Sequence, residues 1–174
     1  MKLKELYEMK QQKGTYVGVK FDKETVDAIS KYIKDNNIPN AIKPDEIHTT
    51  LLYSRKHCPN YIPGGMYKKP IIATPKEFTV WETNPDAGTK TKCLIVKLNC
   101  PELVDRHNEL MDEHDATFDY DKYQPHVTLS YDIGDIDIKD LPDISDTVKE
   151  FKIIEEYGET LQLDWAKTKG VDKK

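Results

Sequence analysis

The sequence contains two histidines that are each followed, two positions later, by a threonine. His48 precedes Thr50, and His126 precedes Thr128. Both pairs lie in runs rich in β-branched and aromatic residues, which are typical of β-strands. Because successive side chains of a strand point to opposite faces, each histidine shares a face with its threonine. Each predicted strand therefore carries an imidazole and a hydroxyl on one face and apolar side chains on the other.

Paired imidazoles on either side of a phosphodiester can cleave it by general acid–base catalysis. Near pH 7 a neutral imidazole can accept a proton while a protonated one donates a proton, and each role is worth about 10²- to 10⁴-fold in rate. The threonine hydroxyls can hydrogen-bond the non-bridging phosphate oxygens, whose charge must be stabilised in the transition state. This chemistry needs no metal ion or cofactor. It suits a substrate that carries its own nucleophile, such as a ribose 2′-OH beside the phosphate.

Hydrophobic periodicity predicts the elements that position these groups. The apolar faces of the two histidine strands are expected to consist of Ile47, Leu51 and Tyr53 in the first strand and Val127, Leu129 and Tyr131 in the second. In chain order, the other predicted elements are a helix over 1–12, a strand over 15–21, a helix over 23–36 capped by Asp22, an irregular candidate lid over 54–70, a strand over 71–83, a turn over 84–88, a strand over 93–98, a helix over 101–114, an acidic loop over 134–146, and final strands over 147–157 and 159–165 joined at Gly158.

This order of elements predicts an α+β fold with two similar halves, each with a histidine strand that follows a helix. We expect two antiparallel sheets that flank a central cleft, with the helices outside, so that both imidazoles face the cleft. Residues 1–165 form a single bilobal domain in this interpretation, and 166–174 form a polar C-terminal tail.

Composition narrows the classes of partner. The net charge of −5 argues against binding to long nucleic acid, which depends on a basic face. A mean hydropathy of −0.72 without a long apolar run predicts no membrane span. Three cysteines without CxxC spacing indicate reduced thiols in a cytoplasmic protein and no metal site. Arg55 and Arg106 are the only arginines, and Lys20 and Arg55 are candidate phosphate contacts outside the catalytic set.

On these motifs the chain resembles the 2H phosphoesterase superfamily, which is defined by two H-x-[ST]-x motifs in duplicated lobes. The matching segments are His48-Thr49-Thr50-Leu51 and His126-Val127-Thr128-Leu129, and the resemblance spans most of residues 15–165. Within the superfamily the chain is similar to the phage anti-CBASS phosphodiesterases, and the opening Tyr16-Val17-Gly18-Val19 adds to the pattern.

The resemblance implies a two-lobed (LigT-like) fold and catalytic positions at His48, Thr50, His126 and Thr128. It also implies metal-independent cleavage of 3′-5′ bonds in cyclic di- and trinucleotides, such as 3′,3′-cGAMP, through attack by the ribose 2′-OH. Such an enzyme silences a bacterial defence pathway and acts in the cytosol of the host cell. Which histidine is the base, which bases and ring size are preferred, the final product and the oligomeric state stay open.

Aromatic and acidic residues are candidates for binding the bases of such a substrate. Tyr16 and Trp81 lie on non-core faces of their predicted strands, and stacking of a base on an aromatic ring is worth about 1–3 kcal/mol. Trp165 shares a face with two leucines, which favours the core, and the resemblance adds it to the substrate-binding set. The resemblance also implies an acidic residue near the C-terminal end of the domain that helps to hold the bases. Of Glu155, Glu156 and Glu159, alternation favours Glu159 because it lies beside Trp165.

Two other functions use the same features. One is a 2′,3′-cyclic phosphodiesterase or 2′-5′ RNA-end processing enzyme, which the acidic charge and scarce arginines disfavour. The other is a sponge that binds a cyclic nucleotide without cutting it, for which paired proton-transfer groups have no use. The remaining histidines, His57, His107 and His114, are expected to be exposed residues without a role in the site.

Overall fold

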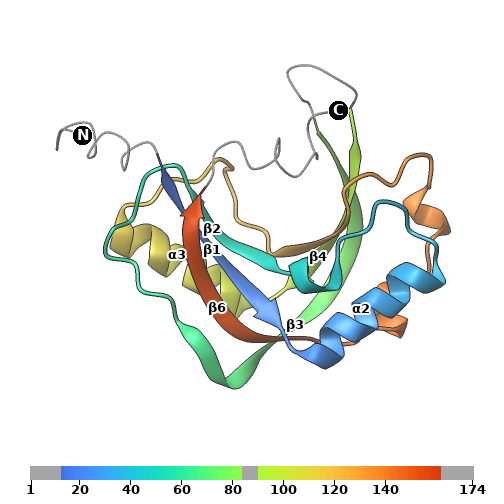
Figure 1. The fold of residues 1–174 in the computed structure, drawn as a ribbon, viewed down its shortest axis with the longest axis horizontal. Coiled ribbons are helices and arrows are strands. Elements are labelled where there is room, and N and C mark those ends of the chain that lie inside the picture. Colours follow the sequence, from blue (N-terminus) through green and yellow to red (C-terminus); the bar gives the residue numbers. More distant parts are fainter. Residues whose placement is uncertain (1–12, 84–89, 162–174) are drawn as a thin grey trace.

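A computed structural model describes residues 13–83 and 90–161 of the chain. In this part of the chain, six strands form one antiparallel sheet in the order β2-β1-β6-β3-β4-β5. The strands are β1 (Gly14–Phe21), β2 (Thr49–Ser54), β3 (Gly65–Glu82), β4 (Lys92–Asn99), β5 (His126–Ser130) and β6 (Phe151–Leu161). Figure 1 shows that the sheet is strongly bent, so that its two halves face each other.

The long strand β3 joins the two halves into one sheet. Its first part, up to Ala73, pairs with β6, and its second part, from Thr74 onward, pairs with β4. The α+β class is confirmed, but the prediction of two separate sheets is wrong. The structure differs because β3 begins at Gly65, inside the segment that was predicted to be an irregular lid. Two lysines and a proline interrupt the alternating pattern of a strand there.

The last strand also differs from the prediction. We expected two strands joined by a turn at Gly158, whereas β6 runs through this glycine without a break. A Cβ atom at position 158 would lie 2.4 Å from the Tyr61 ring. Gly158 is therefore needed for close packing and does not mark a turn, which the sequence alone does not distinguish.

One helix packs behind each half of the sheet (Figure 1). Helix α2 (Lys23–Asp35) begins at the predicted cap, where Asp22 accepts a hydrogen bond from the Thr25 amide at 2.9 Å. Its buried Tyr32 packs on Phe78 of β3, with ring centroids 5.8 Å apart. Helix α3 (Pro101–His114) starts with proline and packs against β2. Within the described residues, no helix is long and apolar enough to cross a membrane.

The two edge strands of the sheet, β2 and β5, are brought together by the chain that leads into β2. The Ile42 amide donates to Leu129 O at 2.9 Å, and the Tyr131 amide donates to Asn40 O at 3.0 Å. The buried Ser130 hydroxyl donates to Pro39 O at 2.6 Å. Each edge strand carries one of the two motifs, so these bonds fix the motifs relative to each other.

Short 3-10 turns complete the described chain, at η1 (Pro44–Glu46), η2 (Ile138–Asp140) and η3 (Ile144–Asp146). Asp137 and Asp143 of the acidic loop cap η2 and η3 through bonds to backbone amides. The predicted helix over 1–12, the turn over 84–88, Trp165 and the tail over 166–174 lie outside the described residues.

Candidate active site

The two motif histidines occupy equivalent positions at the starts of the edge strands. His48 lies one residue before β2, and His126 is the first residue of β5. His48 Nδ1 lies 2.6 Å from Glu46 O, and His126 Nδ1 lies 2.9 Å from Gln124 O. Because a carbonyl oxygen can only accept, Nδ1 carries the hydrogen in both rings. The Nε2 atom of each ring is therefore the one left for proton transfer.

The environment of both imidazoles favours their neutral forms. Burial lowers the pKa of His48, against the opposing effects of its bond to Glu46 O and the negative charge of Glu159. Burial also lowers the pKa of His126, and a positive charge on His48 lowers it further. A proton on His48 therefore disfavours a second proton on His126.

Both histidine strands contain a β-bulge directly after the threonine. In β2, Thr50 and Leu52 pair with consecutive residues of β1, which leaves Leu51 as the extra residue. In β5, Thr128 and Ser130 pair with consecutive residues of β4 in the same way. The two motifs are therefore alike in backbone geometry as well as in residue types.

The bulge in β2 corrects one sequence prediction. Tyr53 was expected on the apolar face, opposite His48. The extra residue reverses the alternation, so Tyr53 pairs with Tyr16 and their rings meet edge to face at 6.5 Å. We call the side of the sheet that carries His48 and Tyr16 the inner face.

Tyr16 lies on this inner face beside the first motif, as predicted. Its hydroxyl is 2.8 Å from Thr50 Oγ1, and its ring centroid is 6.2 Å from that of His48. Burial raises the pKa of Tyr16 well above its ordinary value, and the neighbouring Tyr157 raises it further. The phenol therefore stays protonated, and its bond to Thr50 fixes that hydroxyl beside the imidazole.

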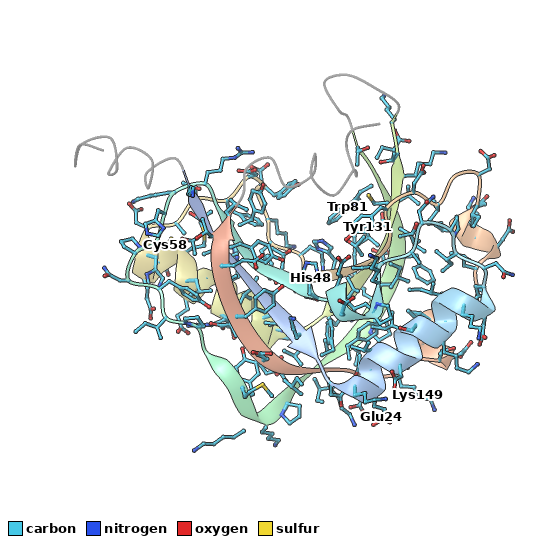
Figure 2. All side chains as sticks on the ribbon, viewed as in Figure 1. Glu24, His48, Cys58, Trp81, Tyr131 and Lys149 are labelled. Carbon is cyan, nitrogen blue, oxygen red and sulfur yellow. The ribbon has the colours of Figure 1, made fainter. Side chains whose placement is uncertain are left out.

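The second motif lies beside Trp81 of β3. The Trp81 and His126 rings meet edge to face with centroids 4.5 Å apart, and Trp81 is 39% exposed. Thr128 pairs with Ile95 of β4, which packs with Cys93 and Tyr131 in a small cluster separate from the main core. Figure 2 shows His48 on one half of the sheet and Trp81 and Tyr131 together on the other.

The three candidate glutamates fall on different faces. Glu159 is exposed and pairs with Tyr16, and its charge acts on His48, so it lies on the inner face. Glu156 is 1% exposed on the outer face, where Arg106 grips it with Nε–Oε1 and Nη2–Oε2 distances of 2.8 and 2.9 Å. Glu155 pairs with Lys20 across β1 and β6. Trp165, the other predicted substrate contact, is outside the described residues.

A pocket of about 390 Å³ lies beside Glu156 on the outer face of the sheet. It is lined by residues of α3, of the sheet and of the loop before β3: Gly64, Tyr67, Ile71, Glu102, Asp105, Arg106, Glu109 and Glu156. Tyr61 and the Gly64 amide also donate to Glu156, at 2.8 and 3.0 Å. This network joins α3 to β6, and its lining contains neither motif histidine.

Sequence reasoning missed a third histidine that supports the first motif. His107 was expected to be exposed, but it is 4% exposed, and its Nδ1 donates to Leu51 O at 2.8 Å. Its ring stacks on Tyr123 at 4.3 Å, and the Tyr123 hydroxyl donates to Thr50 O at 2.7 Å. The missed signal is the spacing of His107 from Leu103 and Leu110, which places it on the buried face of α3.

The other two histidines are less exposed than expected, and Arg55 has a carboxylate partner. His114 was expected to be exposed, but its side chain is only 12% exposed and packs on Tyr61 with ring centroids 5.9 Å apart. His57 is half-buried. Arg55, a candidate phosphate contact, instead forms a fork with Asp119 through Nε–Oδ1 and Nη2–Oδ2 distances of 3.0 Å.

The fold and site define an α+β protein whose single bent sheet holds two equivalent His-x-Thr strands at its edges. Residues 13–168 match the sequence model of the family described as Anti-CBASS protein Acb1. The chain is 34% identical over 165 residues to the Anti-CBASS protein Acb1 of Vibrio phage KVP40, covering 95% of this chain and 97% of the relative. It is 37% identical over 153 residues to that of Acinetobacter phage Ac42, covering 88% and 94%. It is 34% identical over 154 residues to that of Enterobacteria phage T4, covering 88% and 91%. The chain belongs to the anti-CBASS protein Acb1 family.

Proposed function

We propose that the protein is a phosphodiesterase of the 2H phosphoesterase superfamily that cleaves 3′-5′ bonds in cyclic di- and trinucleotides, such as 3′,3′-cGAMP. One observation carries this proposal. His48 and His126 have the same tautomer, fixed by a backbone carbonyl two residues earlier, and each precedes a threonine on the same face of its strand. Two electrostatically coupled imidazoles suit acid–base catalysis better than ligand binding alone.

In the proposed reaction, the neutral imidazole takes the proton of a ribose 2′-OH through Nε2. The 2′-oxygen forms a bond to phosphorus, and the bond from phosphorus to the 5′-oxygen breaks. The protonated imidazole gives its proton to that leaving oxygen, so the products are a 2′,3′-cyclic phosphate and a 5′-OH. Thr50 and Thr128 hold the non-bridging oxygens. The bond from Tyr16 to Thr50 keeps one of these hydroxyls in position.

Aromatic and acidic groups of the inner face are proposed to bind the bases. Trp81 offers a partly exposed ring beside His126, and Tyr16 offers a second ring beside His48. Glu159, exposed next to Tyr16, can accept hydrogen bonds from a guanine edge. Trp165 completes the proposed substrate-binding set.

The family suggests the biological role. The relatives are named anti-CBASS proteins and several come from phages, so we place this protein's action in the cytosol of an infected bacterium, against CBASS immunity. The proposed partner is a cyclic oligonucleotide, and the net charge of −5 does not favour long nucleic acid.

Chromatography of a panel of cyclic oligonucleotides after incubation with the protein tests this function. We expect linear products in the presence of a chelator, and about a 10²- to 10⁴-fold loss of rate in His48→Ala and in His126→Ala. His57→Ala, which removes a histidine in the loop before β3, is the matched control and should keep its activity. Recovery of intact cyclic ligand from the wild type would instead indicate a sponge, and cleavage confined to RNA ends would indicate the RNA-processing alternative.

A further inference from the structure

The inner face beside His48 carries a lysine and a tyrosine that have no role in the reaction described above. Lys20 follows Tyr16 and Gly18 along the same face of β1, and Tyr157 of β6 pairs with Gly18. The positive charge of Lys20 lowers the pKa of His48, in keeping with its place on the inner face. Both side chains therefore lie next to the first motif.

Tyr157 reaches toward the motif across a glycine. A Cβ atom at position 18 would lie 2.6 Å from the Tyr157 hydroxyl and 2.7 Å from Cζ, so the ring lies over bare backbone. On its other side, Gly18 pairs with Thr50 of β2. Burial raises the pKa of Tyr157 to about 12, so its hydroxyl remains a hydrogen-bond donor at neutral pH. The absence of a side chain at Gly18 thus lets the Tyr157 ring pack over β1 at the position that pairs with Thr50.

Lys20 contacts the Tyr157 ring and forms no salt bridge, although Glu155 of β6 lies opposite it across the sheet. Its Nζ lies 5.3 Å from the centroid of the Tyr157 ring, within the range of a cation–π interaction. The salt bridges formed among the described residues do not include Lys20. The lysine beside the second motif differs in this respect, because Lys97, which pairs with His126, has Nζ 3.5 Å from Glu77 Oε1.

We propose that Lys20 and Tyr157 form a phosphate-binding subsite that holds the scissile phosphodiester against His48. The inference rests on the proposed function for the identity of the substrate. The ammonium group neutralises charge that develops on the non-bridging oxygens, and the phenol hydroxyl donates to one of them beside Thr50. The site is therefore electrostatically asymmetric, because the cation available for phosphate lies in the His48 half.

Kinetics of matched lysine variants test this subsite. Lys20→Met should lower kcat/KM about 10- to 100-fold, the loss typical of a hydrogen bond to a charged group, whereas Lys20→Arg should restore most of it. Lys20→Met should also weaken the dependence of kcat/KM on ionic strength. The control, Lys97→Met, removes the same charge from the other half and should keep wild-type kinetics. Equal effects of Lys20→Met and Lys97→Met would overturn the inference and leave the proposed function intact.

A second measurement does not depend on cleavage. Inorganic phosphate is titrated into the protein while the His48 ring signals are followed by NMR. We expect a saturable shift in the wild type and in Lys97→Met, and its loss in Lys20→Met and in Gly18→Ala, whose methyl group displaces Tyr157. A wild type that cleaves no cyclic oligonucleotide would refute the proposed function, and this titration would still decide the subsite. An unchanged shift in Lys20→Met would refute the subsite.

Discussion

At the scale of single residues, the two site histidines are held in the same tautomer by the same kind of local bond. The carbonyl of the residue two positions earlier fixes Nδ1–H in His48 and in His126. Burial then disfavours the charged form of each ring, and charge on one ring disfavours charge on the other. Both effects favour neutral rings and disfavour a pair in which both rings are protonated.

The pH dependence of kcat/KM follows from these shifts. The rate falls at low pH when the base becomes protonated, and at high pH when the acid loses its proton. Because burial lowers both pKa values, we expect a bell-shaped profile centred below about 6.5, the ordinary pKa of histidine. Initial rates on a cyclic dinucleotide, measured at constant ionic strength across the pH range, would show it. A maximum above pH 7 would contradict the burial of the pair.

The same profile tests the place of Glu159. Its negative charge raises the pKa of His48, so Glu159→Gln should move the profile toward lower pH. Glu150→Gln, at an exposed position just before β6, is the matched control and should leave the profile in place. A shift toward higher pH in Glu159→Gln would contradict this placement.

The sequence was sufficient to predict the placement of several inner-face residues. Strand alternation predicted that His48 and Thr50 share a face and that Tyr16 lies on the non-core face of its strand, and the pairing of β1 with β2 brings the three together. Tyr53 was misplaced because alternation assumes a regular strand, and a bulge inserts one residue. That Lys20 forms no salt bridge was also out of reach, because a sequence does not show the distance from the lysine to the carboxylate of Glu155 opposite it.

At the scale of elements, α3 and β6 are joined by a buried ion pair between Arg106 and Glu156. The Glu156 carboxylate is 1% exposed and accepts two hydrogen bonds from the Arg106 guanidinium. Arg106 therefore offsets the cost of burying this negative charge. These bonds also hold α3, whose His107 donates to Leu51 O behind the first motif. The pair therefore supports the strand that carries His48 and Thr50 from the outer face.

The only two arginines in the sequence provide a matched comparison of stability. Arg106→Ala leaves a buried carboxylate unpaired and should lower the free energy of unfolding by about 3–5 kcal/mol. Arg55→Ala breaks a similar fork to Asp119 at the surface, where the arginine side chain is 57% exposed, and should cost about 0–1 kcal/mol. Urea unfolding followed by circular dichroism would measure both. Equal losses would show that Glu156 is better hydrated than its burial indicates.

Elements with a strong periodic pattern were predictable from the sequence, and those that depend on long-range packing were not. The helices behind the sheet were found within a residue or so because Asp22 and Pro101 mark their starts. Gly158 was read as a turn because the sequence does not show Tyr61 packed against its backbone. The hydrogen bond of His107 was out of reach because Leu51 O is 56 residues away, although the spacing of His107 from Leu103 and Leu110 does indicate the buried face of α3.

At the scale of the whole molecule, the relative position of the two motifs depends on how the sheet's edges meet. The motifs lie on opposite edges of one bent sheet. The two halves of the sheet are joined by β3, which pairs with β6 in its first part and with β4 in its second part. Directly beside the motifs, the strap over residues 39–42 bonds to β5 and leads into β2. The sequence predicts two histidine strands but carries no pattern for this strap, because its bonds are formed by backbone atoms and by Ser130.

Ser130→Ala would test the strap. Its buried hydroxyl donates to Pro39 O at 2.6 Å and accepts from the Asp132 amide at 3.1 Å. The matched control is Ser54→Ala, at the far end of β2, where a buried hydroxyl likewise donates to Lys56 O at 2.7 Å and accepts from the Thr117 amide at 3.0 Å. Each change leaves a donor and an acceptor unsatisfied, so both variants should lose about 1–3 kcal/mol of stability.

The two variants should differ in catalysis, because only Ser130 bonds to the strap over residues 39–42, which joins β5 to the first motif. A displacement of one imidazole by about 1 Å can cost 10²-fold, so we expect Ser130→Ala to lower kcat/KM about 10- to 100-fold at a temperature where both variants are fully folded. Ser54→Ala should remain close to the wild type under the same conditions. The measurement pairs thermal melts with rates on the same samples. If both variants lost stability and neither lost activity, the distance between the histidines would be set by the bend of β3 and not by the strap.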